Sequence, residues 1–94
     1  LDAPPDGLVI LDVRAPEEFA AGRLPGASMI NIYDEDFPEK VGALDKSVPY
    51  LVYCKAGGRS AKAAGFMAQI GFTDVVDYGG GWMDWAETGY PVER

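Results

Sequence analysis

The chain has 94 residues, of which 48% are hydrophobic, and this is enough for one compact domain with a single core. We therefore expect residues 1–94 to form one domain, with residues 1–7 as a flexible lead, because two prolines and a glycine disfavour regular structure there. The formal net charge of −7 argues against nucleic acid and anionic membranes as partners, and no apolar run is long enough to span a bilayer.

Strand-like and helix-like segments alternate along the chain. Four short apolar runs predict buried strands, at residues 8–11, 28–32, 50–53 and 75–78. Helices are predicted between them, from Pro16 to Gly22, over residues 37–44, from near Ser60 to Gly71, and over residues 82–86. This alternation predicts an α/β domain with a mostly parallel sheet and right-handed crossovers.

Two residue types decide which chemistry is open to the chain. It contains no histidine, which removes the commonest general base and the commonest metal ligand. It contains one cysteine, Cys54, so neither an intrachain disulfide nor a zinc site built from several thiolates can form. Cys54 is therefore the only candidate for thiol chemistry, and its activation must come from something other than an imidazole.

Cys54 follows the most apolar predicted strand, at the edge where parallel sheets place their sites. The next residues, Lys55-Ala56-Gly57-Gly58-Arg59-Ser60, form a short loop that leads into a helix. Its glycines let backbone N–H groups turn inward as an anion nest, and the helix start and the two basic side chains add positive potential. These surroundings favour a thiolate. The alternative interpretation of Cys54 is a small buried core residue.

A cysteine phosphatase or an arsenate reductase is a competing hypothesis, since cysteine phosphatases also place a Cys-x5-Arg loop between a strand and a helix. Here four residues, and not five, separate Cys54 from Arg59. A ring that is one residue shorter should enclose a smaller group, which favours a single sulfur atom over a tetrahedral phosphate.

Motifs spread over nearly the whole chain resemble the rhodanese-like domain family, and their order and spacing make the resemblance specific. They are Leu11-Asp12-Val13-Arg14, Glu18-Phe19, Gly22-Arg23-Leu24-Pro25-Gly26-Ala27, Asn31, the loop from Cys54 to Arg59 with Ser60, Gly80-Gly81 before Trp85, and Gly89-Tyr90-Pro91-Val92. The resemblance implies a three-layer domain in which helices flank both faces of a central, mostly parallel sheet of four to five strands. It also implies sulfur transfer without a metal or an organic cofactor.

The resemblance assigns roles to individual residues. Cys54 would accept sulfur as a persulfide, and the amides from Lys55 to Ser60 would cradle it. Asp12 and Arg14 would support the site or the fold, with an ion pair to Glu17 or Glu18 as the purely structural interpretation. Gly80 and Gly81 would line the mouth of the site. Trp82 and Trp85 are expected in the core, and Trp82, next to the glycines, is the one placed to wall the site.

These features predict a sulfurtransferase of the thiosulfate sulfurtransferase type. A small donor, thiosulfate or another persulfide, would load Cys54, and cyanide in an assay or a small or protein thiol would remove the sulfur. The exposed loop would leave the persulfide open to a partner. The alternative is a low-turnover sulfur carrier or regulatory binding module. We expect a monomer, and a reactive lone thiol fits the reducing cytoplasm, although an exported or periplasmic location stays open.

Overall fold

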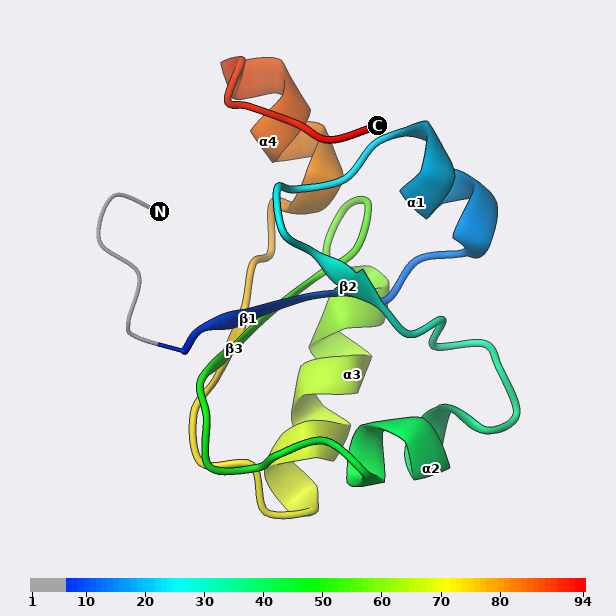
Figure 1. The fold of residues 1–94 in the computed structure, drawn as a ribbon, viewed down its shortest axis with the longest axis vertical. Coiled ribbons are helices and arrows are strands. Elements are labelled where there is room, and N and C mark those ends of the chain that lie inside the picture. Colours follow the sequence, from blue (N-terminus) through cyan, green and yellow to red (C-terminus); the bar gives the residue numbers. More distant parts are fainter. Residues whose placement is uncertain (1–6) are drawn as a thin grey trace.

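A computed structural model of the chain describes residues 7–94, so the predicted flexible lead lies, apart from Gly7, outside the described residues. One sheet contains strands β1 (Val9–Asp12), β2 (Ser28–Met29), β3 (Tyr50–Tyr53) and β4 (Val75–Asp77). The strand order is β2-β1-β3-β4, and all neighbours run parallel. Parallel strands need crossover connections, which here include helices α1 (Pro16–Ala21), α2 (Phe37–Gly42) and α3 (Gly58–Gln69), and α4 (Gly81–Thr88) follows β4 (Figure 1).

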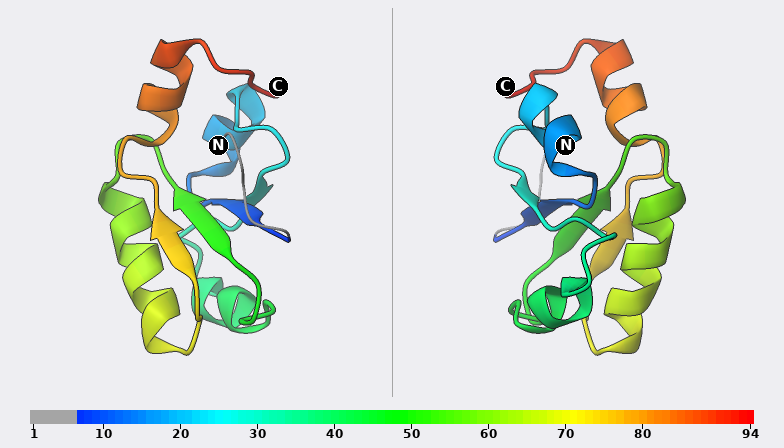
Figure 2. Two further views of the ribbon diagram at one scale, coloured as in Figure 1. Left: turned by 90° about the vertical axis from the view of Figure 1, so that its left-hand side faces the viewer. Right: turned by 90° about the vertical axis from the view of Figure 1, so that its right-hand side faces the viewer.

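The side chains of β3 alternate between two hydrophobic clusters, one on each face of the sheet. Tyr50 and Val52 belong to the first cluster with residues of α2 and α3, whereas Leu51 and Tyr53 belong to the second with Trp85 of α4. Figure 2 shows α3 lying along the sheet, with α1 and α4 together near the end where the strands stop. The predicted α/β fold with helices on both faces is confirmed, and the sheet has four strands.

Several element boundaries differ from the predictions by one or more residues, and those of α3 and β2 have a clear physical reason. Helix α3 begins at Gly58, before the predicted start near Ser60, because Gly57 in a left-handed conformation ends the loop and its carbonyl accepts the N–H of Ala61 at 3.0 Å. Strand β2 stops at Met29, although residues 28–32 were expected to be extended. Its partner β1 ends at Asp12, so only two residue pairs align between these strands.

The start of α4 binds the backbone of the loop that follows β3. The N–H of Trp82 donates to the carbonyl oxygen of Cys54 at 2.8 Å, and the N–H of Met83 donates to that of Lys55 at 3.0 Å. The first amides of a helix have no partner within the helix, so these bonds satisfy donors and loop acceptors together. Gly81 permits the close approach, because its φ is 60° and a Cβ there would overlap the Cys54 carbonyl oxygen.

The amphipathic helices cover the sheet and are short. None of the helices formed by residues 7–94 has the length and apolar character needed to cross a membrane.

Replacing Gly81 by alanine should separate α4 from the loop. We expect Gly81→Ala to lower the free energy of unfolding by about 2 to 4 kcal/mol, since it adds left-handed strain to a steric clash. Urea denaturation measures this change. Gly65→Ala is the matched control, because a Cβ at this position in α3 meets nothing within 4 Å. It should raise the free energy of unfolding by about 0.5 to 1 kcal/mol. Equal stability of Gly81→Ala and the unchanged chain would contradict the packing described.

Candidate functional site

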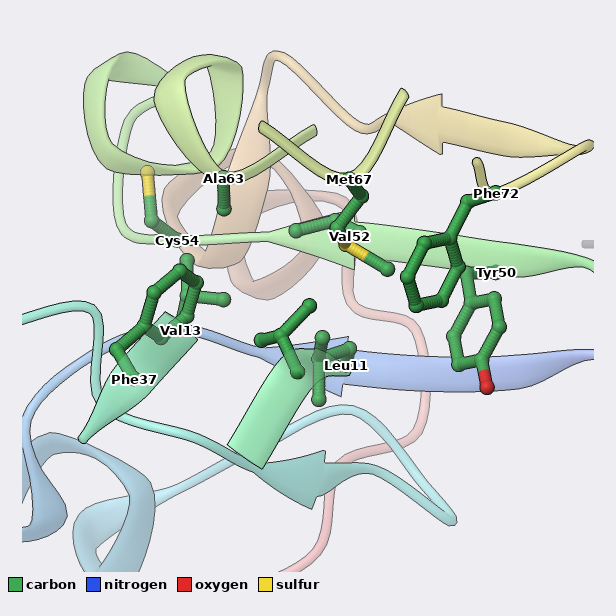
Figure 3. Packing of buried hydrophobic residues seen from close by; sticks show 10 residues of the cluster. Leu11, Val13, Phe37, Tyr50, Val52, Cys54, Ala63, Met67 and Phe72 are labelled. Atoms are coloured by element: carbon green, nitrogen blue, oxygen red, sulfur yellow. The ribbon is translucent and has the colours of Figure 1, made fainter. Parts of the chain in front are cut away.

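Cys54 lies at the junction of β3 and the loop, with its sulfur pointing toward the start of α3 near Ala63 (Figure 3). The N–H of Gly57 donates to the Cys54 Sγ at 3.0 Å, and Ser60 Oγ lies 3.6 Å from the same sulfur. Gly57 has a φ of 106°, and a Cβ there would lie 2.5 Å from the carbonyl oxygen of Gly79. A glycine is therefore needed for this amide to face the sulfur.

Opposing effects act on the acidity of Cys54. Burial raises the pKa of the thiol, because a thiolate loses its solvation. Hydrogen bonds from the Ser60 hydroxyl and from the amides of Ser60, Gly57 and Ala56 lower it, and together they outweigh burial. The pKa of Cys54 therefore lies below its ordinary value without any imidazole. Three of the six loop amides predicted to cradle the sulfur are the ones that act here.

The loop is exposed, but the sulfur is not. Lys55, Ala56 and Gly58 are exposed to solvent, whereas Cys54 is only 1% exposed. The expectation that the exposed loop leaves the persulfide open stays a prediction, whereas the resting thiol is buried. The reason is packing, because Cys54 belongs to the first hydrophobic cluster together with Ala63 of α3.

Two shallow hollows border the loop. One is lined by Ile32, Tyr33, Gly58, Arg59 and Lys62. The other is lined by Arg14, Glu18, Ala21, Gly22, Lys55 and Trp82. Trp82 thus walls a hollow beside the loop while Trp85 is buried in the second cluster, as their positions in the sequence suggested.

Arg59 closes the loop through a bidentate ion pair with Glu18 of α1. Its Nη1 donates to Oε1 at 2.7 Å and its Nη2 donates to Oε2 at 3.1 Å. The hydrogen bond from Arg59 lowers the pKa of Glu18 to about 2, although partial burial opposes the shift. The Arg59 charge also interacts with Cys54, so it remains part of the electrostatic surroundings of the sulfur.

Asp12 and Arg14 form a structural ion pair with each other, whereas Glu18 pairs with Arg59. The Arg14 Nη2 lies 2.8 Å from an Asp12 carboxylate oxygen, and both side chains are buried. The Tyr53 hydroxyl donates to the same carboxylate at 2.8 Å. Buried charges need such complete pairing. The group ties the end of β1 to β3 beneath the loop, which supports the fold around the site.

Gly80 and Gly81 lie at the start of α4, and their expected place at the mouth of the site stays a prediction. Gly81 is buried against the carbonyl groups of Cys54 and Lys55, whereas a Cβ on the exposed Gly80 would overlap the Asp84 side chain within α4. Gly81 therefore supports the loop from its outer side, where the carbonyl groups point.

Asp77 is a site residue that the sequence analysis missed. It ends β4, and its carboxylate accepts a hydrogen bond of 2.6 Å from the hydroxyl of the buried Ser60. The rule that carboxyl ends of parallel strands share one edge of the sheet could have indicated it. Residues 7–94 hold no group of three or more His, Cys, Asp or Glu side chains placed for a metal ion.

The family of the chain is established by a sequence model described as Rhodanese-like domain, which matches residues 1–88. The chain belongs to the rhodanese-like domain family. The resemblance found in the motifs is thereby confirmed, and it covers the whole of the site.

Relatives of this rhodanese-like domain carry the name sulfurtransferase. The thiosulfate sulfurtransferase GlpE of Pseudomonas putida is 35% identical over 88 residues, which cover 94% of this chain and 77% of that protein. The thiosulfate sulfurtransferase 16 of Arabidopsis thaliana, a chloroplastic protein, is 38% identical over 93 residues, 88% of this chain and 78% of its own. These relatives support a sulfurtransferase role.

Solved structures share the fold. A rhodanese-related protein from Thermoplasma volcanium matches with a TM-score of 0.83 and 38% identity, over 92% of this chain and 83% of that chain. The Rhodanese_3 like domain of the Anabaena protein Alr3790 matches with a TM-score of 0.82 and 29% identity. The match covers 94% of this chain and 100% of that chain.

The Arg59–Glu18 pair should make stability depend on pH. The folded chain lowers the pKa of Glu18 from its ordinary value of 4.5 to about 2, so the stabilisation is present above pH 4.5 and is lost as the pH falls toward 2. Glu18→Gln should therefore lower the free energy of unfolding by about 1 to 3 kcal/mol at pH 7 and by little near pH 2.

Urea denaturation across this pH range tests the prediction. Glu17→Gln is the matched control, because Glu17 is an exposed neighbour on the same helix. A loss that is independent of pH, or equal in both variants, would show that the ion pair does not stabilise the fold.

Proposed function

We propose that this rhodanese-like domain is a thiosulfate sulfurtransferase that carries a sulfane sulfur as a persulfide on Cys54. The observation that carries the proposal is the Gly57 amide at 3.0 Å from Sγ, together with the Ser60 and Ala56 donors. They stabilise negative charge on sulfur in a chain without histidine. Relatives named thiosulfate sulfurtransferase, 35% and 38% identical, supply independent support.

The first half-reaction loads the sulfur. The Cys54 thiolate attacks the outer sulfur of thiosulfate, a new S–S bond forms, and the old S–S bond breaks. The electron pair of that bond leaves with sulfite, so the negative charge of the thiolate ends on the outer sulfur of the persulfide. A donor persulfide would react in the same way and leave as a thiolate. No proton transfer is needed, which suits a site without a general base.

The second half-reaction removes the outer sulfur from Cys54. An acceptor such as cyanide or a thiolate attacks the outer sulfur, and the S–S bond to Cys54 breaks to restore the thiolate. The amides of Ala56, Gly57 and Ser60 stabilise the thiolate that this step restores, because they point at Sγ before the reaction begins. The backbone bonds from α4 hold the loop in this orientation.

The surroundings of the loop favour a small anionic donor. The sulfur is buried, and we expect a donor to approach it from a hollow beside the loop. Lys55 lines one hollow and Lys62 lines the other, whereas Arg14 and Arg59, which also line them, are paired with Asp12 and Glu18. Positive side chains at both entrances attract an anion such as thiosulfate even though the whole chain is acidic.

A sulfur carrier of low turnover is the second candidate, and the burial of Cys54 favours it. A sulfur that is 1% exposed meets bulky acceptors slowly, so a loaded chain could hold its sulfur until a specific partner displaces the loop. Phosphatase chemistry has less support, because Arg59 binds Glu18 with both of its terminal nitrogens and does not face an open anion site.

Intact mass after treatment with thiosulfate, measured without reductant, tests the proposal. The unchanged chain should gain the mass of one sulfur atom, and the gain should disappear in Cys54→Ser, because no other thiol is present. Sulfite should be released continuously when cyanide is added, whereas a carrier should release about one equivalent and then stop. No mass gain on Cys54, or release of phosphate from an aryl phosphate, would refute the proposal.

A further inference from the structure

Ser60 lies between the reactive sulfur and a carboxylate on another strand. Its Oγ is 3.6 Å from Cys54 Sγ and 2.6 Å from Asp77 Oδ1, and the serine is fully buried. Asp77 ends β4 and is exposed, so it can exchange its other hydrogen-bond partners with solvent. The three side chains come from the end of β3, the first turn of α3 and the end of β4, and the parallel sheet brings them together.

The hydroxyl of Ser60 has a single proton and two acceptors within reach. The Asp77 carboxylate lies at 2.6 Å and the carbonyl oxygen of Gly57 at 3.1 Å. Bonds to a charged acceptor are shorter and stronger than bonds to a neutral one, so the proton is directed at Asp77. A lone pair of Oγ then faces the sulfur, and the Cys54 thiol is the donor in that contact.

We infer that Asp77 is a positioning residue for Cys54, which holds the Ser60 proton away from the sulfur and so makes Ser60 an acceptor for the thiol. When the thiol gives its proton to water, the hydroxyl must turn from Asp77 to donate to the thiolate. Water then replaces Ser60 at the exposed carboxylate. The stabilisation that Ser60 offers to the thiolate is therefore reduced by the loss of its bond to Asp77.

The hydrogen bond between Asp77 and Ser60 also affects sulfur transfer, and this part of the inference rests on the proposed function. In the persulfide the negative charge is on the outer sulfur, and Sγ needs no donor from Ser60. The Ser60–Asp77 bond can therefore persist in the loaded state, whereas it is broken in the free thiolate. Asp77 thus disfavours the thiolate relative to the persulfide, and it shifts the balance with thiosulfate and sulfite toward the loaded chain.

Other charged groups lie on the elements around the loop. Arg59 on α3 interacts with the sulfur and is bound by Glu18 on α1, Lys55 lies in the loop, and the buried Asp12–Arg14 pair lies at the end of β1. Helix α2 contributes the apolar side chains Phe37 and Val41 to the cluster that contains the sulfur. Replacing Asp77 leaves all of these groups in place, so a change in the ionisation of Cys54 reports on Asp77.

The ionisation midpoint of Cys54 tests the inference without any sulfur transfer. The ultraviolet absorbance of the thiolate is recorded against pH, as a difference from the same variant that also carries Cys54→Ser. Asp77→Asn should lower the midpoint by about one pH unit, a tenfold rise in the thiolate fraction on the acid side. An asparagine lacks the charge, and its amide can donate to Ser60, which frees the hydroxyl to donate to the sulfur.

Two controls separate positioning from charge. Asp74→Asn removes the same charge from an exposed residue at the opposite end of β4, and it should leave the midpoint unchanged. In a Ser60→Ala background, Asp77→Asn should no longer shift the midpoint, because Asp77 acts on the sulfur through the Ser60 hydroxyl. An unchanged or raised midpoint in Asp77→Asn overturns the inference, and so does an equal shift with and without Ser60. A shift as expected in a chain that gains no sulfur would refute the proposed function alone.

Discussion

The orientation of the peptide groups between Cys54 and Ser60 is the constraint on which the site depends. The amides of Ala56, Gly57 and Ser60 face inward toward the sulfur, and the carbonyl groups of Cys54 and Lys55 face outward, where the first amides of α4 bind them. Each half of the arrangement requires the other, because a peptide plane that turns its N–H inward turns its C=O outward. Gly57 and Gly81 are the two positions at which this geometry excludes a side chain.

The loop is held from two further directions by charge. Arg59 reaches across to Glu18 of α1, and the buried Asp12–Arg14 pair fastens the end of β1 to Tyr53 beneath the loop. Arg59 is one of the two basic side chains expected to add positive potential, and its main contact is the ion pair with Glu18. Negative charge on the sulfur is stabilised chiefly by neutral dipoles, which need no proton of their own and do not titrate near neutrality.

The burial of Cys54 affects both the acidity of its thiol and the access of reagents to it. Packing against Ala63 and the first cluster raises the pKa of the Cys54 thiol and keeps large reagents away from it. The hydrogen bonds from the amides lower this pKa again. A small anion fits these conditions better than a bulky substrate does. The same burial makes hydrogen bonds to the sulfur effective, since water does not compete for it.

The class of fold and the position of the single thiol follow from the amino-acid sequence alone. Short apolar runs and helical stripes are local patterns, so the four parallel strands, Cys54 and its glycine loop could be read from them. The partners of Arg14, Arg59 and Ser60 could not. Ser60 meets Asp77, 17 residues away, and Arg59 meets Glu18, 41 residues away, only because parallel pairing brings separate strand ends and helix starts to one edge of the sheet. The burial of the sulfur was likewise decided by packing against α3, since no local pattern states how deep a strand end lies.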